Sequence, residues 1–379
     1  YVGLSGIGGV QRNFVEYLNY ALEADEYLDH KVYTLGNVDS EYDLQLDVNN
    51  IKNPFVLIEL IIDIASKNKI VHFYNNLTSY KVALLLLFVP SKNLIFHERG
   101  SAWNISKKHS FILKFIAWKS NLIIANSKAT KILLEKKFNI SRKKIKVLHN
   151  GISFSDYKNN KKASFSNLDG CFQIGFLGRF DSPKGIHVLI KSMQKLKSSN
   201  IKLIIAGDGP LNNEIKELSK NLNNIKLIGR IKNPYKFFEK ISLLVVPSIR
   251  EPLGNVCIEA GYSKTPVLAS NIDGIPEIIT NHISGELLNP SRPLTAIKSQ
   301  KVLAYPEYVV NPIDGELMTP LEIDPIELAD KILELSMNPV KLYKYSENLH
   351  FQVSKNFSIS RYTEKLHEIY NNLLINNSK

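Results

Sequence analysis

Two series of strand-length apolar runs alternate with helical patterns along this chain, and this alternation limits the fold more than any other feature. The runs occupy residues 31–35, 69–74, 93–98, 121–127 and 144–151 in the first series, and 172–178, 201–207, 225–229, 241–248 and 265–270 in the second. Apolar strands separated by helices are typical of parallel sheets covered on both faces. The sequence therefore predicts an α/β fold of two Rossmann-like, doubly wound domains.

Helical patterns fill the intervals between the strands, at 54–67, 78–87, 107–119, 127–138, 185–197, 211–222 and 254–263. Two more follow the second series, one that begins near Pro325 and an amphipathic one at 358–375. Doubly wound sheets bind ligands beyond the carboxyl ends of their strands. We therefore expect the functional residues around a cleft across which the two domains face each other.

A polar stretch at 152–170, rich in Lys, Asn and Ser, separates the two series and predicts a domain boundary. We expect one domain at 1–160, a second at 161–355, and a C-terminal helix at 356–379 that packs back toward the first domain. Because the chain opens with YVGLSGIGG, we also expect the first strand of the first domain to be mostly missing.

Two near copies of one hexapeptide, GELLNP at 285–290 and GELMTP at 315–320, interrupt the second series. A single pair is too little for a solenoid repeat. We expect an insertion near 291–312 or a local duplication, and chance similarity remains the alternative.

Positive charge is concentrated in one part of the chain. The formal net charge is +12, and residues 99–162 hold 16 Lys or Arg against two acids. This concentration indicates an anionic partner, such as a membrane, a nucleic acid or a polyanionic glycan. A solvated basic surface is the alternative.

The two cysteines, Cys171 and Cys257, each lie in an apolar run, so we expect buried thiols in a reducing compartment and no metal site built from them. The longest apolar stretch, at 82–90, is far shorter than the ~20 residues of a membrane-spanning helix. We therefore expect no segment that spans a bilayer.

Charged residues that suit a phosphorylated sugar follow two strands of the second series. Arg179 and Lys184 come after the first strand, where two cations could hold a diphosphate without a metal. Glu251 lies in a later loop, and Glu259 lies on the helix that follows Gly254. Buried carboxylates need hydrogen-bond donors, and sugar hydroxyls are suitable ones, although two unrelated glutamates are the alternative.

Two features of the first series are weaker signals. Gly6, Gly8 and Gly9 precede a helix whose free backbone N–H groups would favour an anion, but glycine turns also occur for packing alone. His97 follows an apolar strand, where a histidine is more often structural than catalytic.

Several motifs, in order, resemble one family over nearly the whole chain. They are GIGGVQR near the N-terminus, HERG at 97–100, ANS at 125–127, HNGIS at 149–153, GRF with the following KG at 178–185, EPLGNVCIEA at 251–260 and IDGIPE at 272–277. Together they resemble family 4 retaining glycosyltransferases of the GT-B architecture. In this resemblance the first domain lies on the acceptor side and the second binds a nucleotide sugar.

The resemblance implies a role for each matching residue. Glu259 would bind the ribose hydroxyls of the donor, and Glu251 would hold hydroxyls of the transferred sugar. Arg179 and Lys184 would neutralise the diphosphate, so that neither metal nor other cofactor is needed beyond the co-substrate. His97 would lie beside the donor sugar as a further catalytic residue. The other donor-binding positions would be Gly8, Gly9, Gly254, Asn255, Gly274 and Glu277.

The implied activity is transfer of a hexosyl group from a nucleoside diphosphate sugar to a lipid-linked or polysaccharide acceptor, with retention of configuration. Asp273-Gly274 replaces the two glycines of many relatives and resembles enzymes of bacterial surface-polysaccharide synthesis, including lipopolysaccharide, capsule and exopolysaccharide. The insertion at 291–312 has no counterpart in the usual pattern.

A basic amphipathic segment at 107–119 predicts contact with a membrane. Phe111, Phe115 and Trp118 recur at helical spacing, and Lys107, Lys108 and Lys114 accompany them. We expect a cytoplasmic enzyme, a monomer or weak dimer, bound peripherally to the anionic inner leaflet. A core helix with an exposed basic back is the alternative.

Two other classes of function remain open at this point. A nucleotide-sugar epimerase or a phosphorylase could use the same two-domain fold, although no pyridoxal-phosphate lysine motif of a phosphorylase is evident. A nucleic-acid-binding protein would account for the basic stretch, but it would leave the glutamate pair and the GRF motif unexplained. We therefore expect no nucleic acid partner.

Overall fold

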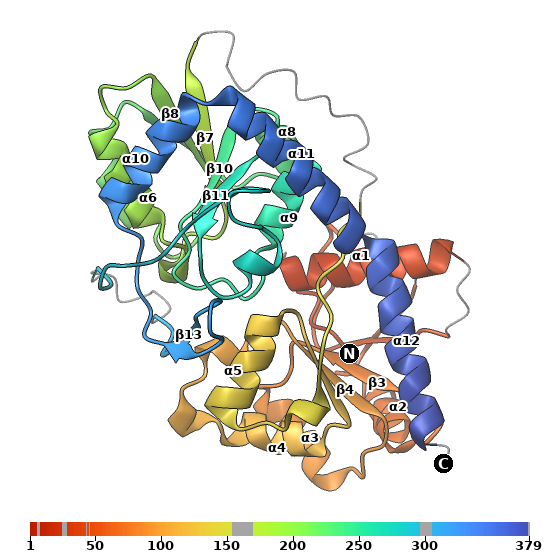
Figure 1. Cartoon of the computed structure of the whole chain (residues 1–379). Helices are drawn as coiled ribbons and strands as arrows, with labels where there is room; N and C mark the ends of the chain where they lie inside the picture. Colours follow the sequence, from red (N-terminus) through yellow and green to blue (C-terminus); the bar gives the residue numbers. More distant parts are fainter. Residues whose placement is uncertain are drawn as a thin grey trace. The chain divides into compact units, whose positions relative to one another are not determined.

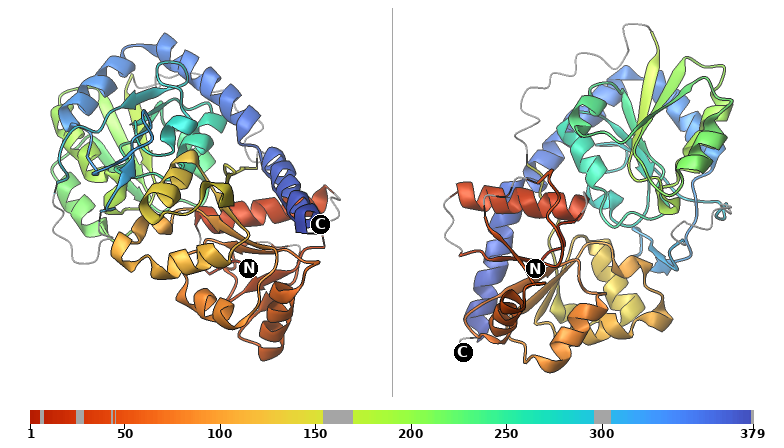
Figure 2. Two further views of the ribbon diagram at one scale, coloured as in Figure 1. Left: turned by 60° about the horizontal axis from the view of Figure 1, so that its bottom comes forward. Right: turned by 180° about the vertical axis from the view of Figure 1, so that it is seen from behind.

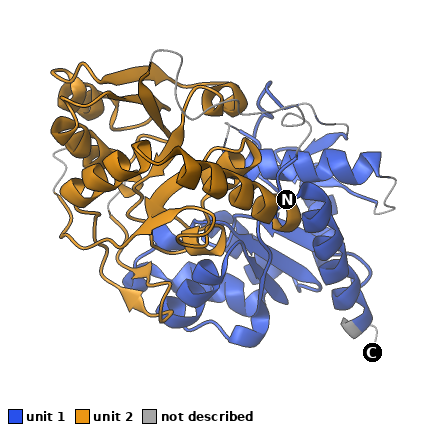
Figure 3. Cartoon of the chain, turned by 45° about the horizontal axis from the view of Figure 1, so that its top comes forward, with its two compact units in different colours: residues 1–153, 357–379 blue, residues 154–356 orange. Residues whose placement is uncertain are grey.

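The computed structural model describes residues 1–5, 8–24, 29–42, 44, 46–153, 170–295 and 305–377. The chain divides into two compact units (Figure 3). Unit 1 comprises residues 1–153 and 357–379, and unit 2 comprises residues 154–356. The predicted boundary at residue 160 lies outside the described residues, as does the middle of the predicted insertion.

Unit 1 is built on parallel strands. Its four-stranded sheet has the order β3-β4-β5-β6, from Val71–Tyr74, Leu94–Glu98, Leu122–Ala125 and Ile145–Val147. A second, two-stranded sheet pairs β1 (Val32–Thr34) with β2 (Val48–Asn50). Residues 1–4 lie between the two sheets, because Val2 N donates to Tyr33 O at 3.0 Å and Tyr74 N donates to Tyr1 O at 2.9 Å.

In the part of unit 1 that the structure describes, six α-helices connect and cover these strands. They are α1 (Gly9–Glu23), α2 (Pro54–Ala65), α3 (Tyr80–Phe88), α4 (Phe111–Lys119), α5 (Lys128–Phe138) and α12 (Ile359–Asn377). Helix α12 lies against α1 (Figure 2). Its apolar residues, among them Tyr362 and Leu366, share a core with Ile95 and Ile124 of the sheet. Helix α12 therefore shares one apolar core with α1 and with the sheet of unit 1.

Unit 2 contains one parallel sheet of six strands, in the order β12-β11-β10-β7-β8-β9. The strands are β7 (Phe172–Leu177), β8 (Ile201–Ala206), β9 (Ile225–Gly229), β10 (Leu243–Val246), β11 (Val267–Ser270) and β12 (Glu286–Leu288). Strands β8 and β9 extend to one side of β7, and the chain then returns to add β10 on the other side. The strand order therefore reverses between β7 and β10, which is where doubly wound sheets bind ligands.

Helices cover both faces of this sheet (Figure 1). Helices α6 (Ile186–Lys195), α7 (Asn212–Ser219) and α10 (Pro325–Ser336) pack together, and α8 (Pro234–Phe238), α9 (Asn255–Tyr262) and α11 (Pro339–Asn356) pack together. The predicted fold class is confirmed by this arrangement of two Rossmann-like units. Helix α11, which the sequence analysis did not predict, packs on α9.

The two near-copy hexapeptides occupy different environments. The first contains β12, whose Glu286 is buried in the main sheet. The second contains β14 (Leu317–Met318), which pairs antiparallel with β13 (Val309–Val310) in a small hairpin. The similar sequences therefore do not form repeated structure.

A buried carboxylate fastens the start of the predicted insertion to the rest of unit 2. Glu322 accepts hydrogen bonds from the hydroxyl and the backbone N–H of Thr295, at 2.6 and 3.1 Å, and lies 2.9 Å from His187 Nε2. Burial alone would raise the pKa of Glu322, but the hydrogen bonds from His187 and Thr295 outweigh it and lower this pKa to about 2.

The low pKa of Glu322 makes the free energy of unfolding depend on pH in the acid range. Its carboxylate stabilises the fold above its unfolded pKa near 4.5, and this contribution is lost as the pH falls toward 2. Glu322→Gln should lower the free energy of unfolding at neutral pH by about 1–3 kcal/mol and flatten the acid dependence. Urea denaturation at several pH values measures both effects. The exposed Glu217→Gln is the control, and acid dependence equal to that of the wild type in the Glu322 variant would contradict the assignment.

Candidate functional site

The loops that follow β7 and β10 are joined by backbone hydrogen bonds. Ile249 N and Arg250 N both donate to Pro183 O, at 2.8 and 3.2 Å. Gly185 allows this approach, since it has a φ of +65° and a Cβ there would lie 1.9 Å from Pro247 O. The two loops at the reversal of strand order therefore form one continuous surface.

A lysine–glutamate pair connects the same two loops. Lys184 Nζ lies 2.5 Å from Glu251 Oε2, and the Ser248 hydroxyl donates to the same oxygen at 3.2 Å. Glu251 is buried, whereas Lys184 is half-buried. The sequence placed these two residues in one site, and the structure brings them into direct contact. A cation and a carboxylate side by side suit a ligand that carries both phosphate and hydroxyl groups.

Helix α9 adds the second predicted glutamate. Gly254 precedes the helix with a φ of 105°, Asn255 begins it, and Glu259 lies half-buried one turn later. Between the two glutamates lies the buried thiol of Cys257. Burial raises the pKa of Cys257, and the charges of Glu251 and Glu259 raise it further. Both carboxylates therefore lie close enough to this thiol to act on it.

Asp273 fixes the loop that carries Glu251, a contact that sequence reasoning missed. Its carboxylate accepts hydrogen bonds from Glu251 N at 2.9 Å and from Val310 N at 2.7 Å. Burial raises the pKa of Asp273 to about 8, although both hydrogen bonds and Arg250 act in the opposite direction. This residue joins the hairpin of β13 and β14 to the glutamate loop. The sequence showed only that an aspartate replaced a glycine.

The remaining predicted residues of unit 2 lie around this group. Gly274 N donates to Glu251 O at 3.1 Å, and a Cβ on Gly274 would lie 2.3 Å from Pro252 O. Glu277 ends the short helical turn that follows, and is half-buried. Arg179 is largely exposed and lies 3.5 Å from Asp181. The structure therefore gathers the predicted residues of unit 2 at the carboxyl ends of β7, β10 and β11.

The predicted residues of unit 1 differ in exposure. Gly8 precedes α1 and Gly9 begins it. His97, on β4, is 0% exposed and stacks on His72 with ring centroids 5.4 Å apart. Burial and the nearby Arg99 hold the pKa of His97 well below its ordinary value, so its ring is neutral. A role of His97 beside a donor sugar stays a prediction.

The basic amphipathic segment forms α4 and the turn before it. The helix buries Leu113, Ile116 and Ala117 against unit 1, and its predicted contact residues lie on other sides. Phe111 and Trp118 are 80% and 70% exposed. Phe115 is half-buried, and Lys107, Lys108 and Lys114 are exposed. The aromatic side chains are therefore not the core face of this helix.

Exposed apolar side chains continue onto the neighbouring helices. Helix α3, which packs on α4, exposes Tyr80, Leu84, Leu87 and Phe88, and α2 exposes Phe55, Ile58 and Ile62. Large exposed apolar groups in such numbers are typical of an interaction surface. Within the described residues no helix has the length and apolar character needed to cross a membrane.

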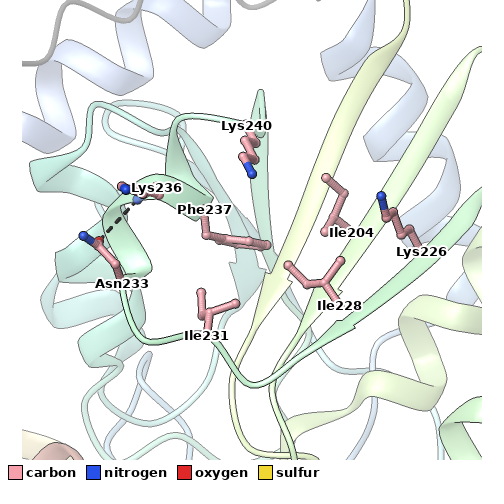
Figure 4. Close-up of a pocket in the computed structure, with 8 residues that line it drawn as sticks. All are labelled: Ile204, Lys226, Ile228, Ile231, Asn233, Lys236, Phe237 and Lys240. Carbon is pink, nitrogen blue, oxygen red and sulfur yellow. Dashed lines mark hydrogen bonds between the residues drawn. The ribbon is translucent and has the colours of Figure 1, made fainter. Parts of the chain in front are cut away.

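A cavity of 150 Å³ lies elsewhere in unit 2 (Figure 4). Ile204, Ile228 and Phe237 line it, with Lys226, Lys236 and Lys240 among the other lining residues. None of the predicted site residues lines this cavity. Within the described part of the chain, no group of three or more His, Cys, Asp or Glu side chains could hold a metal ion.

Comparison with known proteins finds a family match for part of the chain. Residues 157–298 match the family described as glycosyl transferases group 1. A capsular polysaccharide biosynthesis glycosyltransferase, CapM of Staphylococcus aureus, is 35% identical over 36% of this chain and 38% of its own length. An N-acetylgalactosaminyltransferase of Campylobacter jejuni that acts on a diphospho-undecaprenol substrate is 32% identical over 40% of this chain and 42% of its own length.

An uncharacterised glycosyltransferase of Methanocaldococcus jannaschii is 30% identical over 51% of this chain and 54% of its own length. The chain thus spans about half or less of the length of these curated relatives. Solved structures match more fully. HepE of Anabaena, solved with UDP and glucose, superposes with a TM-score of 0.72 over 98% of each chain at 18% identity. The lipopolysaccharide outer core galactosyltransferase WaaB gives 0.65 over 99% of this chain and 98% of its own, at 15% identity.

These similarities confirm two predictions. The fold is that of the GT-B glycosyltransferases, and the resemblance to the group 1 glycosyltransferases holds for the region that carries the lysine–glutamate pair. The matched region also contains Glu259, Asp273 and Gly274.

The contact between Asp273 and the glutamate loop can be tested directly. Asp273→Gly should lower the free energy of unfolding by about 1–3 kcal/mol, because two buried backbone N–H groups lose their acceptor while the left-handed backbone remains allowed. Hydrogen exchange at Glu251 and Val310 should become faster. The exposed Asn139, also at positive φ, provides the control Asn139→Gly. Unchanged exchange at both amides would contradict the assignment.

Proposed function

We propose that this chain, with a GT-B fold and a group 1 glycosyltransferase match over residues 157–298, is a retaining hexosyltransferase of bacterial surface-glycan synthesis. The observation that carries the proposal is the contact of Lys184 with Glu251 at the reversal of strand order. Unit 2 would bind a nucleoside diphosphate sugar there, and unit 1 would bind the acceptor. A uridine nucleotide is the first donor to test, because HepE was solved with UDP and with UDP-glucose.

The residues of unit 2 would contact different parts of the donor. Lys184 and Arg179 would neutralise the diphosphate, which lowers the energy of the departing charge without a metal. Glu251 would orient the sugar through its hydroxyls, and Glu259 would hold the ribose. Gly254, Asn255, Gly274 and Glu277 would shape the same site. Gly8 and Gly9 of unit 1 would present backbone amides to the phosphates or to the acceptor.

The proposed reaction breaks the bond between the anomeric carbon and the diphosphate oxygen and forms a bond from that carbon to the acceptor oxygen. The proton of the acceptor hydroxyl passes to the departing diphosphate. Attack from the face that the diphosphate leaves would retain the configuration. Glu251 is already paired with Lys184 and Ser248, which supports a sugar-binding role over that of a nucleophile.

The family match favours this reaction over the two alternative classes. An epimerase would act on the same kind of nucleotide sugar but would need no acceptor. A nucleic-acid-binding protein would have no evident use for the lysine–glutamate pair at the reversal of strand order. CapM acts in capsular polysaccharide synthesis, LpsD of Rhizobium meliloti acts in lipopolysaccharide core synthesis, and the Campylobacter jejuni enzyme acts on a diphospho-undecaprenol substrate, which supports a lipid-linked or polysaccharide acceptor.

Donor binding provides the first test. A panel of nucleoside diphosphate sugars should raise the melting temperature of the wild-type protein for one base. Glu259→Ala should weaken this binding about tenfold or more, since the ribose hydroxyls lose their acceptor. The exposed Glu327→Ala on α10 is the matched control. The proposal fails if no nucleotide stabilises the protein, or if Glu259→Ala binds as well as the wild type.

We further propose that α4 holds the enzyme at the cytoplasmic face of an anionic membrane. Its exposed Phe111 and Trp118 would enter the headgroup region, and each nearby lysine would add about 1 kcal/mol of attraction. The apolar side chains of α2 and α3 would extend the same contact. This proposal is separate from the donor site, because it concerns unit 1 alone.

Vesicle binding tests the membrane proposal. Wild-type protein should co-sediment with vesicles that contain phosphatidylglycerol and much less with pure phosphatidylcholine. Exchanging both Phe111 and Trp118 for Ser should reduce binding about tenfold or more, since two aromatic groups leave the interface. Phe351→Ser, a similarly exposed position on α11, is the control. Equal reduction in both variants, or binding that ignores lipid charge, would exclude α4 as the specific contact.

A further inference from the structure

A buried arginine whose two terminal amino groups have no hydrogen-bond partner among the described residues lies directly after β4. Arg99 is 8% exposed, and its two terminal amino groups, Nη1 and Nη2, have no partner within the part of the chain that the structure describes. Burial of an unpaired charge is strongly unfavourable unless another group balances it. An unpartnered buried guanidinium therefore indicates a place built to receive an anion.

The groups around Arg99 are hydrogen-bond donors. Tyr74 of β3 and Tyr362 of α12 are both buried, and a hydrogen bond between their hydroxyls raises the pKa of Tyr74 and acts to lower that of Tyr362. The two hydroxyls lie near enough to affect each other's pKa, and both act on the charge of Arg99. Burial raises the pKa of both hydroxyls, which keeps them protonated. The terminal amino groups of Arg99 and the Tyr74–Tyr362 pair thus offer protons to the same small region.

The carboxylate of Glu16, which acts on the charge of Arg99, already has other partners. Glu16 acts on Arg99, but its Oε1 lies 3.0 Å from Arg12 Nε and its Oε2 accepts from Ser153 N at 3.1 Å. The charge of Glu16 is thus shared with Arg12. This leaves the charge of Arg99 incompletely balanced.

A rigid turn presents Arg99 at the carboxyl end of the sheet. The buried carboxylate of Glu98 accepts from Gly100 N at 2.7 Å, from Ala102 N at 2.9 Å and from the Ser101 hydroxyl at 2.6 Å. These bonds fix the backbone on both sides of Arg99. The neutral ring of His97, just before it, stacks near Tyr362 with ring centroids 6.3 Å apart. Ligands of parallel sheets bind at this end.

We propose that Arg99, Tyr74 and Tyr362 form an oxyanion site within unit 1 that takes phosphate or a phosphate ester. The two amino groups of a guanidinium pair with two oxygens of such an ion, and the hydroxyls reach a third. The site goes beyond the donor site proposed for unit 2, and it requires neither donor nor turnover. The ion is either free phosphate or the phosphate of a substrate bound by unit 1.

Inorganic phosphate is the probe, added to the full chain in chloride buffer at constant ionic strength. Titration calorimetry should show saturable binding that falls about tenfold or more in Arg99→Met and less in Arg99→Lys. Tyr74→Phe and Tyr362→Phe should each weaken it severalfold. Lys184→Met is the control for phosphate bound in unit 2, because binding at Arg99 should be unchanged in this variant. Glycerol phosphate, compared with phosphate, distinguishes a phosphate ester from the free ion as the preferred ligand.

The melting temperature gives a second readout, measured first without phosphate and then at saturating phosphate. Without phosphate, Arg99→Met should melt at the same temperature as the wild type or higher, because it removes an unbalanced buried charge. At saturating phosphate the order should reverse. Hydrogen exchange around residues 98–102 should slow on addition of phosphate.

Three results would overturn the proposal. Phosphate binding could be absent, it could survive in Arg99→Met, or it could disappear in Lys184→Met alone. If Arg99→Met does not fold, the two tyrosine variants and Arg99→Lys decide the question, and unchanged binding in all three rejects the site. Loss of donor binding in Glu259→Ala has no bearing on these outcomes, so the two proposals fail separately.

Discussion

The reversal of strand order between β7 and β10 is the constraint on which the chemistry of unit 2 depends. On either side of this point, consecutive helices cross to opposite faces, and the loops after β7 and β10 are left without a helix between them. Backbone hydrogen bonds to Pro183 then join the two loops. Lys184 and Glu251, 67 positions apart in sequence, meet only because of this order.

The buried carboxylate of Glu251 needs both a charge partner and a fixed backbone. Lys184 and Ser248 satisfy the side chain of Glu251, and Asp273 and Gly274 fix its backbone. Lys184 comes from the loop after β7, Ser248 from the glutamate's own loop after β10, and Asp273 and Gly274 from the loop after β11, so the packing of three loops determines the position of Glu251. This arrangement restricts where the glutamate can move without adding flexible side chains to the site. The hairpin of β13 and β14 becomes part of the same support through Val310.

Regular elements and motif residues could be predicted from the sequence, because both depend on local patterns. The apolar run at 243–246 and the glutamates of EPLGNVCIEA are examples of such patterns. The roles of Asp273 and Arg99 could not be predicted in this way. Asp273 acts through an amide 37 positions later, and Arg99 is notable only because the fold buries it close enough to Tyr362, far along the chain, for the two to interact electrostatically. Helix α11 was missed because its apolar positions are diluted by lysine and asparagine, and packing on α9 stabilises it.

The path of the chain between the two units has a consequence for synthesis. Unit 2 is inserted between residue 153 and residue 357 of unit 1, so its whole sequence leaves the ribosome before α12 does. Until then the face of the sheet that carries Ile95 and Ile124 lacks Tyr362 and Leu366. Domains generally fold as units in the order of their emergence. The sequence of the second unit is therefore complete before that of the first, and the nascent first unit keeps this apolar face uncovered until α12 is made.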